Sequence, residues 1–291
     1  MNKKEKIIEG ILFACAAICV LTTLGIITVL LIQSIQFFSE VPVKDFLTDT
    51  QWTPLFADKH FGILPLLSGT FLTTIIAISI ALPIGLSIAI YLSEYATKKF
   101  RATVKPMMEI LAAVPTVVYG YFALTVVTPF LQIIFPSLSG FNAISPGIVM
   151  GLMIVPIISS LSEDALYAVP KSLREGAYAL GSTKLQTAFR VLIPAASSGI
   201  IVSVILAVSR AIGETMIVAI AAGQQPRLTL DPRVPIETVT TYIVQVSMGD
   251  VPHGSLEYQT IFSAGLSLFI ITLILNNISF LIKKKYREQY E

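Results

Sequence analysis

Charged residues are scarce in this 291-residue sequence. Aspartate, glutamate, lysine and arginine together make up 13% of the chain, whereas hydrophobic residues make up 54%. A soluble domain usually carries about 25% charged residues, because charged side chains cover the surface that faces water. The composition therefore excludes an ordinary soluble domain and predicts that most of the surface faces lipid.

Cysteine, histidine and several catalytic motifs are also scarce or missing. The two cysteines, Cys15 and Cys19, lie four residues apart in an apolar stretch, where we expect small buried side chains rather than a disulfide or a metal pair. The two histidines, His60 and His253, form no metal-binding pattern. The sequence contains no G-x-x-x-x-G-K-[S/T], H-E-x-x-H or G-x-S-x-G motif. We therefore expect no catalytic residue, metal or cofactor in this chain.

The sequence contains a series of long apolar runs instead. About 20 apolar residues are needed to cross the hydrocarbon of a bilayer. Prolines within the third and fourth runs are tolerable where neighbouring helices satisfy the freed carbonyl groups. The runs predict an all-α integral membrane protein with six transmembrane helices, over residues 11–37, 70–92, 110–135, 144–161, 195–222 and 261–282.

Lysine and arginine are distributed unevenly between the segments that connect these runs. With the N-terminus placed in the cytoplasm, the cytoplasmic segments hold fifteen basic residues and the outside segments hold four. Basic residues accumulate in the cytoplasmic loops of membrane proteins, so this distribution predicts that both chain ends are cytoplasmic. The long segments 36–69 and 223–260 are then outside the cell membrane, and segment 162–194 is inside.

Segment 162–194 carries the start and stop signals of short helices. Ser172 and Glu175 form the S-x-x-E pattern of a capping box, in which two side chains satisfy unpaired amide groups at a helix start. The pattern predicts a helix over 173–180 that ends at Gly181, since glycine suits the left-handed conformation after a helix.

A second helix is predicted in the same segment. Thr183 and Gln186 form a T-x-x-Q box, and Pro194 is expected to end the helix where the chain re-enters the membrane. Two well-defined helices between spanning segments favour a rigid surface that binds another protein. Interfacial helices that lie on lipid headgroups are the alternative.

This segment resembles the signature of a known family. Residues 175–194 follow the pattern E-A-A-x3-G-x9-I-x-L-P of the permease subunits of bacterial ABC importers, with a few small or aliphatic exchanges. The resemblance implies the type I ABC importer permease fold, in which this loop forms the coupling helices that bind the ATPase. The coupling residues that it implies are Glu175, Gly176, Ala177, Gly181 and Pro194.

The resemblance also implies a division of the chain. Residues 69–282 would form the core transmembrane domain of the permease, with the cytoplasmic coupling loop over 162–194. Residues 1–68 would add one transmembrane helix and the first extracytoplasmic loop, and residues 283–291 would form a cytoplasmic tail.

Arg210 and Glu214 are ionisable residues about halfway along the fifth apolar run. Charged residues at mid-bilayer cost roughly 2.5–3.5 kcal/mol each on insertion scales, and four-residue spacing places these two on one helix face. Arg210 is predicted to contact a passing oxyanion, with Glu214 holding it in place. A salt bridge that only supports the bundle is the alternative. Ser209 and Thr215 could add hydroxyl donors, although helix–helix hydrogen bonds are their more ordinary use.

The chain further resembles the phosphate-transporting permeases of this family, over essentially its full length. The resemblance implies a multi-pass protein of the bacterial inner membrane that imports inorganic phosphate. Its partners would be a second permease, an ATPase dimer and an extracytoplasmic phosphate-binding protein. Permeases for molybdate or sulfate, and an ATP-independent transporter or channel, are the alternatives. The stretches that carry the resemblance are 113–122, 163–166 and 209–216.

Overall fold

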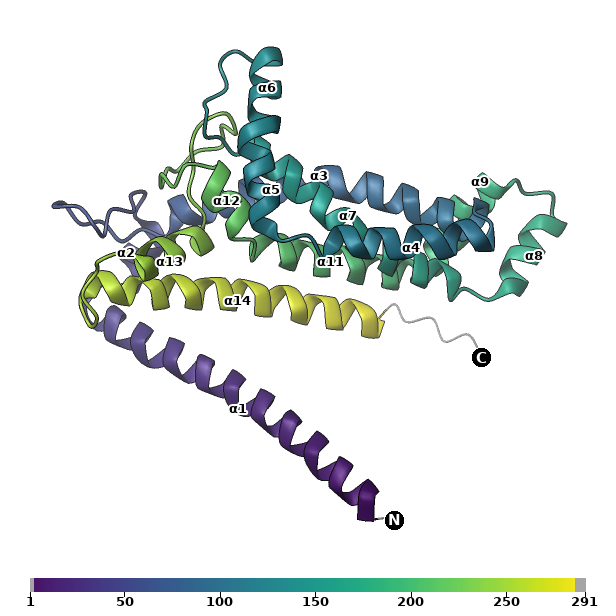
Figure 1. Cartoon of the computed structure of the whole chain (residues 1–291), viewed down its shortest axis with the longest axis horizontal. Coiled ribbons are helices and arrows are strands. Elements are labelled where there is room, and N and C mark those ends of the chain that lie inside the picture. Colours follow the sequence, from purple (N-terminus) through teal and green to yellow (C-terminus); the bar gives the residue numbers. More distant parts are fainter. Residues whose placement is uncertain (1–2, 286–291) are drawn as a thin grey trace.

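The computed structural model describes residues 3–285, and in that range the chain is helical with only two isolated β-bridges. The predicted tail, 283–291, lies mostly outside the described residues. Figure 1 shows the arrangement of the helices. In chain order they are α1 (Lys3–Glu40), α2 (Val43–Thr48), α3 (Leu64–Ile90), η1 (Tyr91–Tyr95), α4 (Lys98–Ala112), α5 (Thr116–Phe122), η2 (Ala123–Val127), α6 (Thr128–Ile134), α7 (Ile144–Tyr167), α8 (Lys171–Ala179), α9 (Lys184–Thr187), η3 (Ala188–Leu192), α10 (Ile193–Ala195), α11 (Ser197–Ile212), α12 (Met216–Ala221), α13 (Val239–Met248) and α14 (Leu256–Lys285), where η marks a π-helix.

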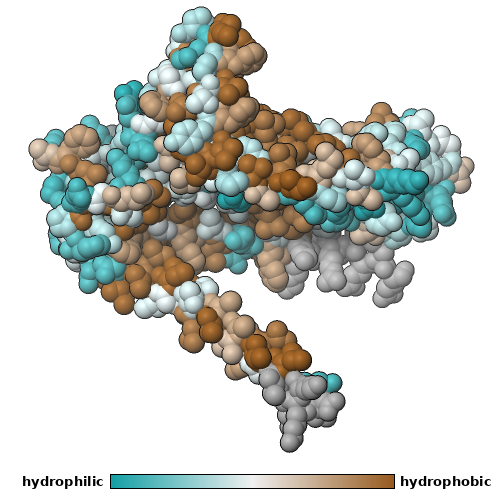
Figure 2. Space-filling view, in the orientation of Figure 1, coloured by the Kyte–Doolittle hydropathy of each residue, from teal (hydrophilic) through white to brown (hydrophobic). Residues whose placement is uncertain are grey.

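The number of membrane-spanning helices agrees with the prediction. A bent pair, Lys184–Ala195 and Ser197–Ile212, whose parts meet at 76°, supplies the sixth span if it is counted as one. Figure 2 shows polar residues gathered toward the two ends of the long axis and apolar residues between them. Five further helical stretches in the described part of the chain are long and apolar enough to cross a membrane: Ile8–Glu40, Leu64–Tyr95, Thr116–Ile134, Ile144–Tyr167 and Leu256–Ile282.

The molecule has two distinct ends along its long axis. The α8 end contains α8 and α9, and the α13 end contains α2, α13 and the loops 49–63 and 222–238. Helix α1 begins, and helix α14 ends, toward the α8 end in Figure 1. The described start of α1 and the described end of α14 therefore lie on the same side of the bundle, and the assignment of this side to the cytoplasm stays a prediction.

Helices α3 and α7 form the centre of the bundle, where small residues allow close approach. A Cβ atom on Gly147 would lie 2.7 Å from Ile76, and one on Gly151 would lie 2.8 Å from the carbonyl oxygen of Ala77. The four-residue spacing places both glycines on one face of α7. Such contacts are typical of membrane bundles, because lipid gives apolar helices little reason to associate and close packing must hold them together.

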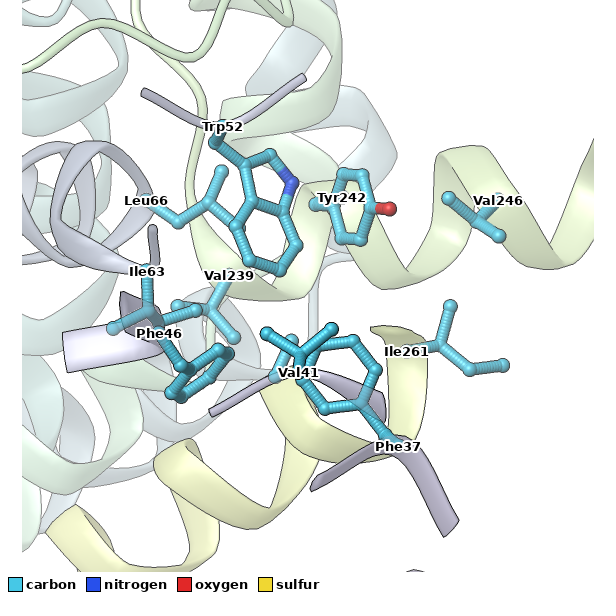
Figure 3. Packing of buried hydrophobic residues seen from close by; sticks show 11 residues of the cluster. Phe37, Val41, Phe46, Trp52, Ile63, Leu66, Val239, Tyr242, Val246 and Ile261 are labelled. Carbon is cyan, nitrogen blue, oxygen red and sulfur yellow. The ribbon is translucent and has the colours of Figure 1, made fainter. Parts of the chain in front are cut away.

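A second apolar cluster holds the α13 end together. Trp52 and Tyr242 meet edge to face, with their ring centroids 5.0 Å apart, as Figure 3 shows. Trp52 is only 1% exposed, so the first loop is a packed part of the fold and not a loose connection. The cluster joins the end of α1, the first loop, α3, α13 and α14 through Phe37, Val41, Phe46, Trp52, Ile63, Leu66, Val239, Tyr242, Val246, Ile261 and Ala264.

Helix α1 diverges from the rest of the bundle (Figure 1). Its most apolar 18-residue window contains no buried residue, and Cys15 and Cys19 are both exposed. The expectation of two buried cysteines is therefore wrong for the chain by itself. This part of α1 therefore exposes its apolar side chains, whereas Ser34 and Phe37 near its end are buried.

The third apolar run is broken rather than continuous. Helix α4 ends at Ala112, and after the turn the chain continues through α5, η2 and α6 in another direction (Figure 1). Pro115 explains the break, because a proline disfavours helical geometry in the residue before it. Only Thr116–Ile134 qualifies as a span, so the predicted run begins six residues too early.

Candidate functional site

Arg210 and Glu214 form an ion pair, but they do not lie on one helix as predicted. The Arg210 Nη1 atom lies 3.3 Å from Glu214 Oε2. Arg210 is in the last turn of α11, whereas Glu214 lies in a break between α11 and α12. The fifth run is thus not one helix, and the prediction that the pair shares a helix face is corrected. Gly213 is the C-cap of α11, with a φ of −85°.

Glu214 is anchored far more firmly than Arg210. Its side chain is 2% exposed, and that of Arg210 is 46% exposed. The Oε1 atom of Glu214 accepts a hydrogen bond from the backbone amide of Met216 at 3.2 Å, at the start of α12. The carbonyl oxygen of Glu214 accepts one from the Thr240 hydroxyl at 2.8 Å. Glu214 therefore fixes the break between the helices and presents a guanidinium whose other nitrogen atoms remain open.

The two hydroxyl residues beside the pair differ from each other. Thr215 donates a hydrogen bond to the carbonyl oxygen of Gly213 at 3.3 Å, within the same break. Ser209 has a buried hydroxyl with no hydrogen-bond partner in the described part of the chain. A buried unpaired hydroxyl costs free energy, so Ser209 is the better candidate for a second polar contact.

The first helix predicted in segment 162–194 is present, with a different start from the predicted one. Helix α8 begins at Lys171 after the N-cap Pro170, and no side chain caps it. The Ser172–Glu175 capping box is therefore wrong. Pro170 is the physical reason, since its fixed φ of −54° already places the chain at a helix start one residue before Ser172.

The end of α8 agrees with the prediction. Gly181 has a φ of +81°, which is the left-handed conformation that glycine adopts without strain. The amide of Ser182 bonds to the Ala177 carbonyl at 3.1 Å and that of Gly181 to the Tyr178 carbonyl at 2.9 Å. These two bonds form a Schellman motif, which turns the chain sharply into the second helix.

The second helix predicted in this segment starts as predicted and ends later. The Thr183 hydroxyl and the Gln186 side chain form both hydrogen bonds of the capping box. Pro194 does not end the helix, because η3 and α10 continue it to Ala195. The chain then bends by 76° into α11. Pro194 is thus the second-last residue of α10, after the π-helical turn η3.

The residues of the signature lie on the exposed tip of the α8 end. Glu175 and Gly176 are exposed, and a Cβ atom on Gly176 would meet no atom within 4 Å. Ala177 is the buried member of the three. Leu180 is 89% exposed, and Leu185 and Phe189 are also exposed. An apolar tip of this kind, next to an acidic residue, is suited to contact with another protein.

Glu94 is a residue of this region that the sequence did not reveal. It lies in η1, at the end of α3, and its side chain is buried. One carboxylate oxygen lies 3.2 Å from Nε of Arg174, and the other accepts a hydrogen bond from the Tyr178 hydroxyl at 3.3 Å. The Glu94 carbonyl accepts a further bond from Lys184 at 3.4 Å. One residue therefore ties both α8 and α9 to α3.

Glu163 and Asp164 form a second ion-paired cluster near the α8 end. Glu163 is fully buried and contacts Arg101 and Lys105, the latter at 3.2 Å. Asp164 lies 2.6 Å from the same lysine. The cluster fixes helix α4 on helix α7. Buried carboxylates need such partners, which supports a structural role for these two acids.

The architecture is that of the permease subunit of a type I ABC importer. The chain is similar to a solved bacterial ABC transporter involved in the import of the acidic polysaccharide alginate, with a TM-score of 0.61, 16% identity and coverage of 99% of both chains. It is also similar to the MetNI methionine ABC transporter in an inward-facing conformation, with a TM-score of 0.56, 18% identity and coverage of 77% of this chain and 94% of the other. Identities this low show the fold alone.

Sequence comparison identifies the family. Residues 81–288 match the family of binding-protein-dependent transport system inner membrane components, and the chain belongs to this family. It is 37% identical over 266 residues to the probable ABC transporter permease protein YqgH of Bacillus subtilis, covering 91% of this chain and 86% of that one. It is 33% identical over 283 residues to the phosphate transport system permease protein PstC of Mesorhizobium japonicum, covering 89% and 84%. The chain is therefore a multi-pass membrane component of an ABC importer.

Proposed function

We propose that this permease forms part of the translocation pathway for inorganic phosphate. The half-exposed guanidinium of Arg210, held by the buried Glu214, is the observation that carries the proposal. A guanidinium stays charged at every accessible pH and binds phosphate oxygens in pairs. Relatives that are named phosphate permeases support phosphate as the anion.

The ion pair suits transport better than tight binding. An unpaired arginine in a low-dielectric pathway would hold an oxyanion strongly and release it slowly. Glu214 offsets part of the positive charge, and the open side of Arg210 remains available. The contact is then strong enough to attract phosphate and weak enough to let it leave.

The remaining machinery would be supplied by partners. A second, PstA-like permease would complete the pathway, and a PstB-like ATPase dimer would bind ATP and magnesium. A PstS-like binding protein would deliver phosphate from outside. The α8 end would face the cytoplasm, and residues 162–194 would contact the ATPase. Molybdate or sulfate is the alternative cargo, because one arginine serves any of these oxyanions.

The test of the pathway is phosphate uptake by the complete transporter in liposomes. Arg210→Gln should lower ATP-dependent uptake at least tenfold and leave assembly intact, because the variant removes the charge that contacts the anion. Arg233→Gln is the matched control, since Arg233 is an exposed arginine at the α13 end that pairs with Asp231. Uptake at the wild-type rate in Arg210→Gln would refute the assignment. Competition by unlabelled molybdate or sulfate, measured on the wild type, separates the cargo alternatives.

The coupling assignment has a separate test. Glu175→Lys reverses a charge on the exposed tip of α8 without touching the bundle. Phosphate uptake should fall at least tenfold and ATP hydrolysis should no longer respond to the loaded binding protein. Lys171→Glu, a reversal at the other end of the same helix, is the control for a general charge effect. Phosphate entry in liposomes that lack the ATPase would show a channel or secondary carrier instead.

A further inference from the structure

A cavity at the α13 end has features that the proposed pathway does not use. Its volume is about 290 Å³, near the lower limit of ordinary ligand pockets. It lies between the first loop, the loop after α12 and helix α13. Its lining includes Trp52, Phe56, Gln225, Glu237, Tyr242 and Gln245.

Glu237 is the unusual member of this lining. It is 1% exposed, and its Oε1 atom has no hydrogen-bond partner in the described structure. None of the residues that line the cavity is a lysine, arginine or histidine. Burial raises the pKa of Glu237 to about 8, because no nearby cation offsets the loss of water. Buried carboxyl groups without partners are rare in folded proteins, which indicates that a partner is missing.

The rest of the cavity suits an organic cation. The indole of Trp52 and the phenol of Tyr242 stand at right angles beside each other (Figure 3), and Phe56 is exposed at the margin. Aromatic faces attract lysine and arginine side chains. The amides of Gln225 and Gln245 add acceptors. An oxyanion would meet a carboxyl group here and no positive charge, so the cargo itself is a poor fit.

The charge of the surrounding surface points the same way. The two segments at this end, 36–69 and 223–260, contain eight acidic residues and four basic ones. The opposite end is rich in lysine and arginine. A partner at the α13 end therefore meets an excess of negative charge, and complementary surfaces carry positive charge.

We infer that this cavity receives a lysine or arginine side chain from the extracytoplasmic binding protein, which forms an ion pair with Glu237 and packs against Trp52. The inference rests on the proposed function, since it assumes that the α13 end faces outward and meets a binding protein. It adds that one contact with the binding protein is an ion pair and that Glu237 makes it.

The first test uses a small cation and no partner protein. Trp52 is the only tryptophan of this chain, so 5-fluorotryptophan places a ¹⁹F probe in the cavity wall, and a Trp52→Phe spectrum assigns its signal in the assembled transporter. Titration with n-butylammonium should shift the signal saturably at millimolar concentrations. n-Butanol, the uncharged analogue, should not. Glu237→Gln, which matches the neutral acid in size, should abolish the shift. An equal response to butanol, or a retained response in Glu237→Gln, would overturn the inference.

The second test measures binding of the purified, phosphate-loaded binding protein from the source organism to the transporter in nanodiscs. Glu237→Gln should raise the Kd at least tenfold, and Glu237→Arg should raise it further. Asp250→Asn is the control, because Asp250 is an exposed acid at the same end that does not line the cavity. An unchanged Kd in both Glu237 variants would overturn the inference.

Failure of the inference and failure of the proposed function give different results. If the wild type imports phosphate and Glu237→Gln binds the binding protein normally, the function stands and the cation site is wrong. If the wild type imports no phosphate, the proposed function fails, while the butylammonium titration still decides whether the cavity binds a basic group.

Discussion

The two ends of the molecule treat buried carboxyl groups differently. At the α8 end, Glu94 contacts Arg174, and Glu163 contacts Arg101 and Lys105. At the α13 end, Glu237 is equally buried and has an oxygen with no partner in the described part of the chain. Ion pairs between its own helices make the α8 end a connected unit. The unpaired acid leaves the other end incomplete until a partner arrives.

Neutralising Glu163 is the strongest test of whether the paired carboxyl groups stabilise the α8 end. Glu163→Gln should lower the free energy of unfolding by about 3 kcal/mol, because it leaves Arg101 and Lys105 without their buried partner. Thermal unfolding of the detergent-solubilised protein measures the loss. Asp164→Asn, at a half-exposed acid that contacts only Lys105, should cost less than about 1 kcal/mol. Equal stability of both variants would mean that burial of the pair does not matter.

The pH dependence of stability tests whether the buried Glu237 is uncharged in the folded chain. Its pKa is about 8 in the folded chain and 4.5 ordinarily, so between these values the unfolded chain has released a proton that the folded chain keeps. Stability therefore falls as pH rises, by about 1 kcal/mol per pH unit for this one group. Glu237→Gln should remove that decline between pH 5 and pH 8. The difference between the two thermal unfolding curves isolates this group from the others, and a flat difference would contradict the burial of an uncharged acid.

A smaller effect is expected at Glu94, and it separates stability from coupling at the α8 end. Glu94→Gln keeps the size of the side chain but removes the charge that holds Arg174. Phosphate uptake in liposomes should fall about tenfold while ATP hydrolysis continues, since the coupling helices would move without α3. Glu109→Gln, at an exposed acid of α4, is the control. Equal losses of uptake and hydrolysis would point to disrupted assembly instead.

Regular features of the fold were predictable from the sequence, because they depend on local composition. The apolar runs near α3, α7 and α14 require only length and hydrophobicity. The left-handed Gly181 and the Thr183 box depend on a few neighbouring residues, and both are present. The start of α8 was missed because two signals compete there, and Pro170 prevails over Ser172.

The candidate site was predictable as residues and not as geometry. Arg210 and Glu214 stood out because charge is rare in apolar runs. The break that separates them was not apparent, because Gly213 stands in an otherwise apolar stretch where glycine is common. Glu94 and Glu237 gave no signal, since Glu94 lies just after an apolar run and Glu237 lies in a loop between runs, where acidic residues are ordinary. Their importance depends on burial and on contacts over long sequence distances, such as that between Glu94 and Lys184.

The bend before α11 has a mechanical consequence. The stretch Lys184–Ala195 is a lever arm of about 18 Å at 1.5 Å per residue, set at 76° to the helix that carries Arg210. A displacement of about 3 Å at the tip of this arm corresponds to a rotation of roughly 10° at the elbow. Because the arm lies at 76° to α11, that rotation tilts α11 rather than translating it along its axis. A movement of this arm would thus change the direction that Arg210 faces.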